Sequence, residues 1–252
     1  MRHTFADSTD LFCNFQSREA ALKLYTSPLS PYSARVRASL YFKGLGVEMI
    51  KPSSLGGMAS PAFRAITPIG KIPVLVLDDG FTITESDSIV EFLEDRHPNP
   101  SLRPANPMLR ARARMLSRMV ELYVMGAIGG LQPMMPISLH QPPIAREEKR
   151  IAVHAAQLTK SLGDLEHFLS SEGPHAVGSE LSTADTTLAS FIPFVRAVEG
   201  YLGQKGLVEA HPILAGLVSR FSETAVLQKV FTEVSAAMVE RRAEVQSKFG
   251  VS

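Results

Sequence analysis

Short apolar runs alternate with helical patterns through the first hundred residues of the chain. Four of these runs combine β-branched, aromatic and other apolar residues and are bounded by turn signals, which is typical of short β-strands. They occupy residues 22–26, 47–51, 74–77 and 81–84. Asp78-Asp79-Gly80 separates the last two runs and predicts a hairpin between them.

Three helices are predicted in the same part of the chain, at residues 31–43, 61–66 and 86–97. The last of them meets a proline-rich connector that begins at Pro98. Because proline cannot continue a helix and restrains the residue before it, we place a domain boundary at 98–106. A first domain of mixed strands and helices is therefore expected at residues 22–97.

The pattern over residues 107–252 predicts helices alone. Residues 107–126 are amphipathic. Their polar side carries a stripe of arginines at i, i+4 spacing: Arg110, Arg114 and Arg118. Apolar residues recur at alternating spacings of four and three over 151–169, which is the clearest helical pattern in the chain. Ser182 and Asp185 form a variant capping box at the start of a further apolar helix.

Composition places the chain among globular proteins, with 45% apolar and 20% charged residues. The 26 Lys and Arg nearly balance the 25 Asp and Glu, so the charge does not favour nucleic acid or a membrane surface as a partner. A single cysteine, Cys13, excludes an intramolecular disulfide and a cysteine-rich metal site, and fits a reducing, cytoplasmic environment. Residues 1–21 lack a continuous apolar segment, and we expect a poorly ordered extension there.

Candidate chemistry is concentrated where the first strand meets the first helix. Ser30 stands at the N-cap position, and Pro31 stands at the first helical position, where its missing N–H costs nothing. This arrangement places a hydroxyl beside unpaired backbone N–H groups and the positive end of the helix dipole, which suits an anion. On these residues alone, capping of the helix is the simpler interpretation.

Two later stretches give this site a family context. Residues 67–74 read Thr-Pro-Ile-Gly-Lys-Ile-Pro-Val, and residues 84–89 read Thr-Glu-Ser-Asp-Ser-Ile. Together with the Ser-Pro-Tyr-Ser of residues 30–33, they resemble the glutathione-binding half of the soluble glutathione transferases, in serine-type patterns closest to the tau, zeta and omega classes. The resemblance implies an α/β plus all-α fold. A thioredoxin-like domain with a mixed four-stranded sheet would be followed by an all-helical domain at 107–252.

The resemblance assigns the catalytic role to Ser30, whose hydroxyl would donate a hydrogen bond to the glutathione thiolate. Glutathione's thiol, like free cysteine, has a pKa near 8.5, and lowering that pKa by two units takes about 2.7 kcal/mol. A charge-assisted hydrogen bond of about 1.5–3 kcal/mol and a helix N-terminus worth about 0.3–1 kcal/mol can supply this. Because serine cannot form a mixed disulfide with glutathione, thioltransferase activity is disfavoured. Ser33 is the alternative donor, although pairing with the cap is favoured for it.

The same resemblance implies that glutathione is held by Lys43, Lys71, Ile72, Pro73, Glu85 and Ser86. We expect a cis Ile72-Pro73 peptide, with the Ile72 main chain pairing with the cysteinyl backbone of glutathione. Glu85 suits the ammonium of the γ-glutamyl group, and the helix that starts at Ser86 suits its carboxylate. Lys71 and, with weaker support, Lys43 would meet the glycyl carboxylate. No metal is expected.

The second substrate is expected to be a small hydrophobic electrophile bound between the two domains. Candidate residues for its pocket are Tyr32, Met119, Tyr123, Met134 and Met135. We also expect a homodimer, because the family pairs through its two domains and the arginine stripe offers a partner surface.

Other functions remain open alongside conjugation. Ser30, Ser33 and Arg35-Val36-Arg37 fit the zeta pattern of a glutathione-dependent (maleylacetoacetate) isomerase, whereas Pro31 and Tyr32 depart from it. Reductive cleavage, such as of ether bonds, is a further alternative. A glutathione transferase-like interaction protein without turnover is the alternative from another class, and the retained glutathione motifs argue against it.

Overall fold

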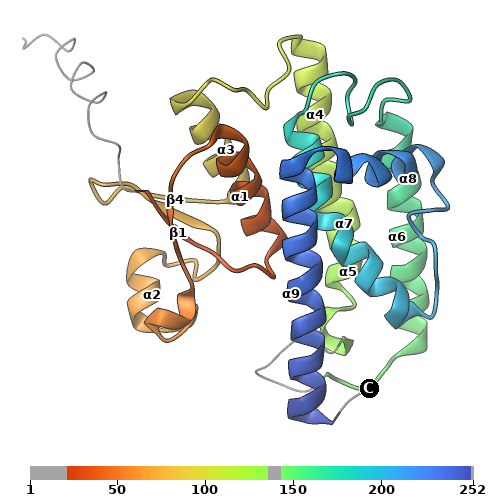
Figure 1. Ribbon diagram of the computed structural model, residues 1–252. Coiled ribbons are helices and arrows are strands. Elements are labelled where there is room, and N and C mark those ends of the chain that lie inside the picture. Colours follow the sequence, from red (N-terminus) through yellow and green to blue (C-terminus); the bar gives the residue numbers. More distant parts are fainter. Residues whose placement is uncertain (1–21, 136–142, 251–252) are drawn as a thin grey trace, which may run out of the picture.

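The computed structural model describes residues 22–135 and 143–250. The predicted extension at 1–21 and Cys13 lie outside the described residues. Figure 1 shows two bodies side by side: a small sheet with its helices, and a larger bundle of helices. None of the helices among the described residues is both long and apolar enough to cross a membrane.

The small body is built on a mixed four-stranded sheet, as predicted. Its strands are β1 (Lys23–Tyr25), β2 (Glu48–Ile50), β3 (Val74–Val76) and β4 (Thr82–Thr84), in the order β2-β1-β3-β4. β2 runs parallel to β1, whereas β3 is antiparallel to both β1 and β4. The β3–β4 pair is the predicted hairpin, in which Leu75 faces Ile83 across the ladder.

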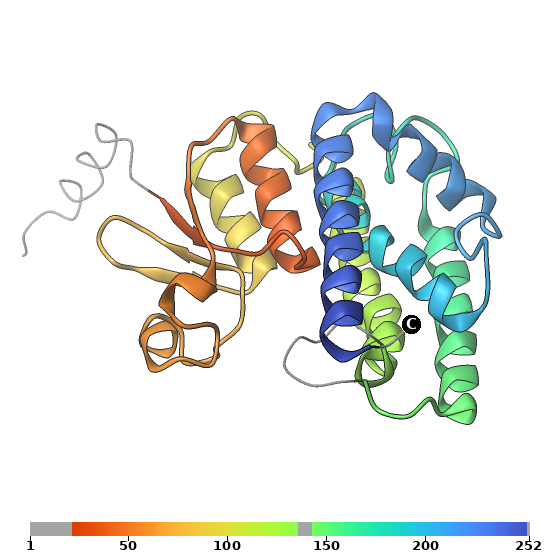
Figure 2. The same ribbon diagram turned by 60° about the horizontal axis from the view of Figure 1, so that its bottom comes forward.

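Helices cover both faces of this sheet. They are α1 (Pro31–Lys43), α2 (Pro61–Ile66) and α3 (Ser86–Arg96), with a short 3-10 helix η1 at Pro52–Leu55. α1 and α3 share one core with the sheet through Leu24, Leu40 and Leu93, all of them fully buried. α2 packs on the opposite face (Figure 2). There Phe63 meets Tyr25 edge to face at 5.6 Å between ring centroids.

The larger body is helical, as predicted. Its elements are α4 (Pro107–Met119), η2 (Val120–Val124), α5 (Met125–Gly129), η3 (Gln132–Met134), α6 (Glu148–Phe168), α7 (Thr183–Leu202), α8 (Pro212–Ser219), η4 (Arg220–Glu223) and α9 (Ala225–Phe249). η2 is one π-helical turn, so the predicted helix at 107–126 continues through a wide turn into α5. The predicted capping box is present at the start of α7, where the Asp185 carboxylate accepts the Ser182 N–H at 2.9 Å.

The two bodies meet along α1, which packs against α7 and α9. Ala34 and Ala38 of α1 are fully buried in the core of the helical body, because their small side chains allow close helix approach. In Figure 1, α9 runs beside α1 along the junction and continues past its end. The junction therefore joins the strand–helix turn at Ser30 to the helical body.

Candidate active site

Ser30 caps α1 and leaves its hydroxyl proton available. Its Oγ accepts the backbone N–H of Ser33 at 3.2 Å, which confirms the predicted N-cap, whereas the Ser33 hydroxyl makes no hydrogen bond with the cap. No acceptor for the Ser30 hydroxyl proton lies among the described residues, and the side chain is half-buried. By contrast, the Ser33 hydroxyl is fully buried beneath the helix. Ser30 is therefore the hydroxyl of this turn that can donate to a ligand.

Arg37, two turns along α1 from Ser30, fastens the loop that leads to Ser30. Its Nη1 donates to the Thr26 hydroxyl at 3.1 Å and to the Ser27 carbonyl at 2.9 Å, and its Nη2 donates to the Pro28 carbonyl at 3.4 Å. The Arg37 side chain is buried, so these charge-assisted bonds form away from solvent. Three bonds from one guanidinium thus hold the loop of residues 26–28 that precedes Ser30.

Glu85 and Ser86 form the turn from β4 into α3. Glu85 adopts φ of 64°, a sparsely populated conformation for a residue other than glycine that costs on the order of 1–3 kcal/mol. Ser86 is buried at the first position of α3, and its Oγ accepts a 2.6 Å bond from the Arg35 guanidinium. Because Ser86 accepts from Arg35, its own hydroxyl proton can still be donated to a ligand.

Arg35 ties this turn to the helical body. The buried guanidinium lies 2.6 Å from Glu121 Oε1 of η2 and 3.6 Å from the Asp87 carboxylate. Glu121 also accepts a 2.7 Å bond from Arg118. The N-terminus of α3 is therefore fixed from both bodies by an ionic network that sequence reasoning missed.

Two adjoining hollows run along the junction. The smaller hollow has a volume of about 310 Å³ and is lined by Tyr32, Thr67, Ile69, Lys71, Ile72, Pro73, Thr84, Glu85, Ser86, Arg118, Glu121 and Leu122. The larger hollow, of about 940 Å³, includes Ser30 and the preceding loop residues 26–29. Lys71 and Ile72 line both hollows, so the two hollows adjoin at these residues, and we refer to the pair of hollows as the groove. Ile72-Pro73 is a cis peptide, as predicted.

The predicted residues thus come together, with one exception. Ser30, Lys71, Ile72, Pro73, Glu85 and Ser86 all line the groove. Ser30 stands at one part of it and the Glu85-Ser86 turn at another, with Lys71 and Ile72 between them. The groove offers a hydroxyl, two helix N-termini and a lysine within two adjoining hollows, which suits an elongated ligand with several charged groups.

Comparison with known proteins bears on this arrangement. Family models described as the N-terminal and C-terminal domains of glutathione S-transferase match residues 24–101 and 131–232. Glutathione S-transferase Z2 of Arabidopsis thaliana is 32% identical over 220 residues, which cover 85% of this chain and 92% of the relative. The chain belongs to the glutathione S-transferase family. The predicted family, enzyme class and fold are confirmed.

Two further likenesses fall within the same family. Maleylacetoacetate isomerase of Rattus norvegicus is 32% identical over 170 residues, covering 66% of this chain and 74% of the relative. The crystal structure of a Tau class glutathione S-transferase from mango, Mangifera indica, superposes with a TM-score of 0.72 at 26% identity. The superposition covers 88% of this chain and 98% of the mango protein's chain. The zeta and tau likenesses expected from the sequence are both present.

The assignment of Lys43 to glutathione is wrong. Its side chain is fully buried, and its Nζ lies 2.8 Å from Glu94 Oε1, with further bonds to the carbonyls of His97 (2.6 Å) and Pro100 (2.8 Å). Lys43 also ends α1, about 20 Å of helix away from Ser30 at 1.5 Å per residue. It therefore fastens the connector between the two bodies rather than reaching the groove.

Only some of the candidates for the electrophile pocket line the hollows; of the others, Met119 and Met134 are buried in the core and Tyr123 is exposed. Met135 lines the larger hollow, whereas Tyr32 lines the smaller one with its ring edge-to-face on Phe191. Burial, and then the negative charge of Glu121, raise the pKa of the Tyr32 hydroxyl, so it is protonated at neutral pH. Met119, Tyr123 and Met134 line neither hollow.

Sequence reasoning also missed the contribution of α9 to the larger hollow. Ala237, Met238, Glu240, Arg241 and Glu244 line it from this helix. Their spacing places them on one stripe of α9, which a helical projection of residues 225–249 could have found. Nothing local to the sequence indicated that this stripe faces Ser30.

Proposed function

We propose that this chain is a glutathione transferase in which Ser30 activates the glutathione thiolate for attack on a small hydrophobic electrophile. One observation carries the proposal. The half-buried Ser30 hydroxyl accepts the Ser33 N–H at 3.2 Å, keeps its own proton available, and stands at the N-terminus of a 13-residue helix in the groove wall. A thiolate there would gain both a hydrogen bond and the favourable end of the helix dipole.

Glutathione would lie along the smaller hollow with its thiol directed to Ser30. The carboxylate of its γ-glutamyl group would meet the Ser86 hydroxyl and the first N–H groups of α3, and its ammonium would meet Glu85. The Ile72 main chain would pair with the cysteinyl backbone, and Lys71 would meet the glycyl carboxylate. All of these residues line the groove, which supports this placement.

The electrophile would occupy the rest of the larger hollow. Ile128, Met135 and Phe194 give this space apolar walls from the helical body, and Met238 closes it from α9. Such walls favour an apolar substrate body. With serine in place of cysteine at position 30, the thiolate has no disulfide partner in the turn and is directed to addition or displacement.

A second candidate is a glutathione-dependent isomerase. It is favoured by the likeness to maleylacetoacetate isomerases, of which the rat protein is 32% identical to this chain. Lys51 lines the larger hollow and could meet a substrate carboxylate there, whereas Arg241 in the same hollow is ion-paired with Glu244 at 3.0 Å. We further propose a homodimer, for which a monomer mass in light scattering at micromolar concentration is the contradicting result.

Two measurements separate these functions. Retention on immobilised glutathione tests the binding half of the groove, and failure to bind would reject both enzymatic candidates. Initial rates with glutathione are then compared between an aryl halide and a cis-configured unsaturated dicarboxylic acid. Turnover of the aryl halide supports conjugation, and isomerisation of the diacid without conjugation supports the second candidate. Binding with neither reaction would favour an interaction protein.

A further inference from the structure

The smaller hollow is lined by residues of both bodies. The small body contributes Lys71 and the Glu85-Ser86 turn, and the helical body contributes Arg118 of α4 and Glu121 of η2. Among the described residues, the cationic side chains that line this hollow are those of Lys71 and Arg118. The sequence pattern puts Arg118 in the arginine stripe on the polar side of its helix. The structure shows that this member of the stripe reaches the groove.

The Arg118 guanidinium has spare hydrogen-bond donors. Its Nη1 donates to Glu121 Oε2 at 2.7 Å, and no other acceptor for Arg118 lies among the described residues. The Arg118 side chain is 56% exposed, and an exposed ion pair between residues three positions apart is weak. The remaining N–H groups can therefore donate to a ligand without the loss of a strong internal bond.

A series of short contacts connects Arg118 to the N-terminus of α3. Glu121 accepts from Arg118 through Oε2, and its Oε1 lies 2.6 Å from the Arg35 guanidinium. Arg35 in turn donates to Ser86 Oγ at 2.6 Å. Burial raises the pKa of the Tyr32 hydroxyl, and the charges of Glu121 and Arg118 act on it in opposite directions, so both lie near that ring. These contacts place Arg118 at the end of the hollow where α3 begins.

The charges of glutathione give a second cation in this hollow a partner. Glutathione carries two carboxylates and one ammonium at neutral pH. Glu85 offers a counter-charge for the ammonium, and Lys71 offers one for the glycyl carboxylate. The γ-glutamyl carboxylate meets only neutral donors in the placement proposed above, the Ser86 hydroxyl and the first N–H groups of α3. Lys43, the other lysine expected to bind glutathione, is buried away from the groove. Arg118 supplies the missing positive charge, and a guanidinium can bind a carboxylate through two parallel N–H bonds.

We propose that Arg118 is a further binding residue of the groove and holds the γ-glutamyl carboxylate of glutathione from the helical body. This inference rests on the proposed function. The ligand would join α4 to the N-terminus of α3, so that each body contributes directly to its affinity.

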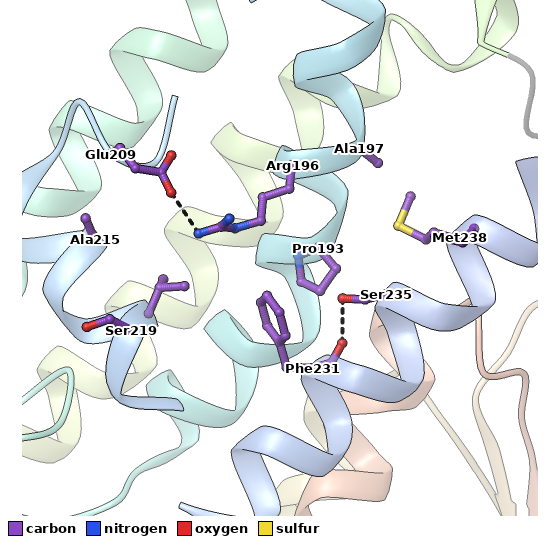
Figure 3. A pocket seen from close by; sticks show the side chains of 11 residues that line it. Pro193, Arg196, Ala197, Glu209, Ala215, Ser219, Phe231, Ser235 and Met238 are labelled. Carbon is purple, nitrogen blue, oxygen red and sulfur yellow. Dashed lines mark hydrogen bonds and ion pairs between the residues drawn. The ribbon is translucent and has the colours of Figure 1, made fainter. Parts of the chain in front are cut away.

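The test measures affinities by calorimetry on the full chain. Arg118→Gln should weaken glutathione binding about tenfold through the loss of a charge-assisted pair. The matched control is Arg196→Gln, because Arg196 of α7 is also an exposed arginine paired with a glutamate, Glu209, at 2.9 Å. Figure 3 shows this pair at the wall of a different hollow, within the helical body. Arg196→Gln should therefore bind glutathione as the wild-type chain does.

Two analogues of glutathione identify the carboxylate that Arg118 meets. γ-Aminobutyryl-cysteinyl-glycine lacks the γ-glutamyl carboxylate, whereas γ-glutamylcysteine lacks the glycine. Wild type and Arg118→Gln should bind the first analogue with affinities that differ by less than about twofold, because the group that Arg118 holds is absent. Binding of γ-glutamylcysteine should still fall about tenfold in Arg118→Gln, because that group is retained.

The outcomes separate this inference from the proposed function. An equal loss for glutathione and both analogues would show that Arg118 acts only through its pair with Glu121, and would overturn the inference. A loss that disappears with γ-glutamylcysteine would assign Arg118 to the glycyl end, and would overturn it as well. Wild-type affinity of Arg118→Gln for glutathione would do the same while leaving the proposed function intact. Absence of glutathione binding in the wild-type chain would instead count against the proposed function.

Discussion

The Arg37 Nε lies 3.1 Å from Glu233 Oε2, a residue 196 positions further along the chain. The same guanidinium bonds the loop before Ser30, so it connects that loop to α9, which also lines the larger hollow. Tyr41 adds to the contact, because its hydroxyl donates to Glu233 Oε1 at 3.0 Å. The position of Ser30 is thus coupled to the helix opposite it.

We expect Arg37→Lys to lower kcat/KM for glutathione conjugation about tenfold, because an ammonium cannot reproduce the fork that holds three loop acceptors. The effect should fall on kcat and on the pH profile more than on the KM for glutathione, since Arg37 positions Ser30 without touching the ligand. Glu233→Gln is the matched control, as it keeps an acceptor for Arg37 and leaves the loop bonds intact. Equal losses of kcat/KM in Arg37→Lys and Glu233→Gln would indicate that Arg37 only holds the two bodies together and does not position Ser30.

Ser30→Ala should raise the pKa of bound glutathione by about one to two units, from the roughly 1.5–3 kcal/mol of a charge-assisted hydrogen bond. At neutral pH less thiolate forms, so kcat/KM should fall about ten- to hundredfold and recover as the pH rises. Ultraviolet absorbance of the thiolate across pH measures the shift. A titration that stays where it was would remove Ser30 from the mechanism.

The chain supplies a control for the lost cap. Ser60 caps α2 as Ser30 caps α1, accepting the Phe63 N–H at 3.1 Å ahead of a proline at the first helical position. Ser60→Ala and Ser30→Ala should each cost about 1 kcal/mol of unfolding free energy. Ser30→Ala alone should move the thiol titration.

At Glu85 the effect of the carboxylate on glutathione binding can be separated from the effect of the backbone conformation on stability. Glu85→Ala and Glu85→Gly both remove the carboxylate and should weaken glutathione binding to a similar extent in calorimetry. Because φ is 64° at this position, the glycine variant should be more stable than the alanine variant by about 1 kcal/mol in urea unfolding. Ser88→Ala, an exposed change in the same helix, is the control for binding. Wild-type affinity in both Glu85 variants would contradict the assignment.

Lys43→Met should destabilise the chain without changing glutathione affinity. Removing the ammonium leaves the buried Glu94 carboxylate without its charge partner, which typically costs about 3–5 kcal/mol. Lys71→Met, on the groove wall, should do the reverse, weakening binding with little effect on the unfolding free energy. If folded Lys43→Met bound glutathione more weakly than wild type, Lys43 would have a role in binding after all.

The local elements were predictable because they follow from local chemistry. Pro31 after Ser30, Pro61 after Ser60 and the hairpin signal at 78–80 mark turns and caps that neighbouring residues determine. Lys43 shows the limit of prediction from neighbouring residues in the sequence. Its sequence neighbours indicate only a helix end, whereas its role is decided by Glu94, which packs against it from α3. Arg35 and Glu121 were missed for the same reason, since their contact joins residues from separate bodies.

The wide turn at Val120–Val124 changes the rotational register between α4 and α5. One extra residue in a helical turn rotates everything after it by about 100° relative to a regular helix. Ile128 follows that turn and lines the larger hollow, and Glu121 lies within it beside Arg35. A relative with an unbroken helix here would match this chain only after a one-residue gap. Deleting a single residue from the turn would redirect the groove wall more than most substitutions in it.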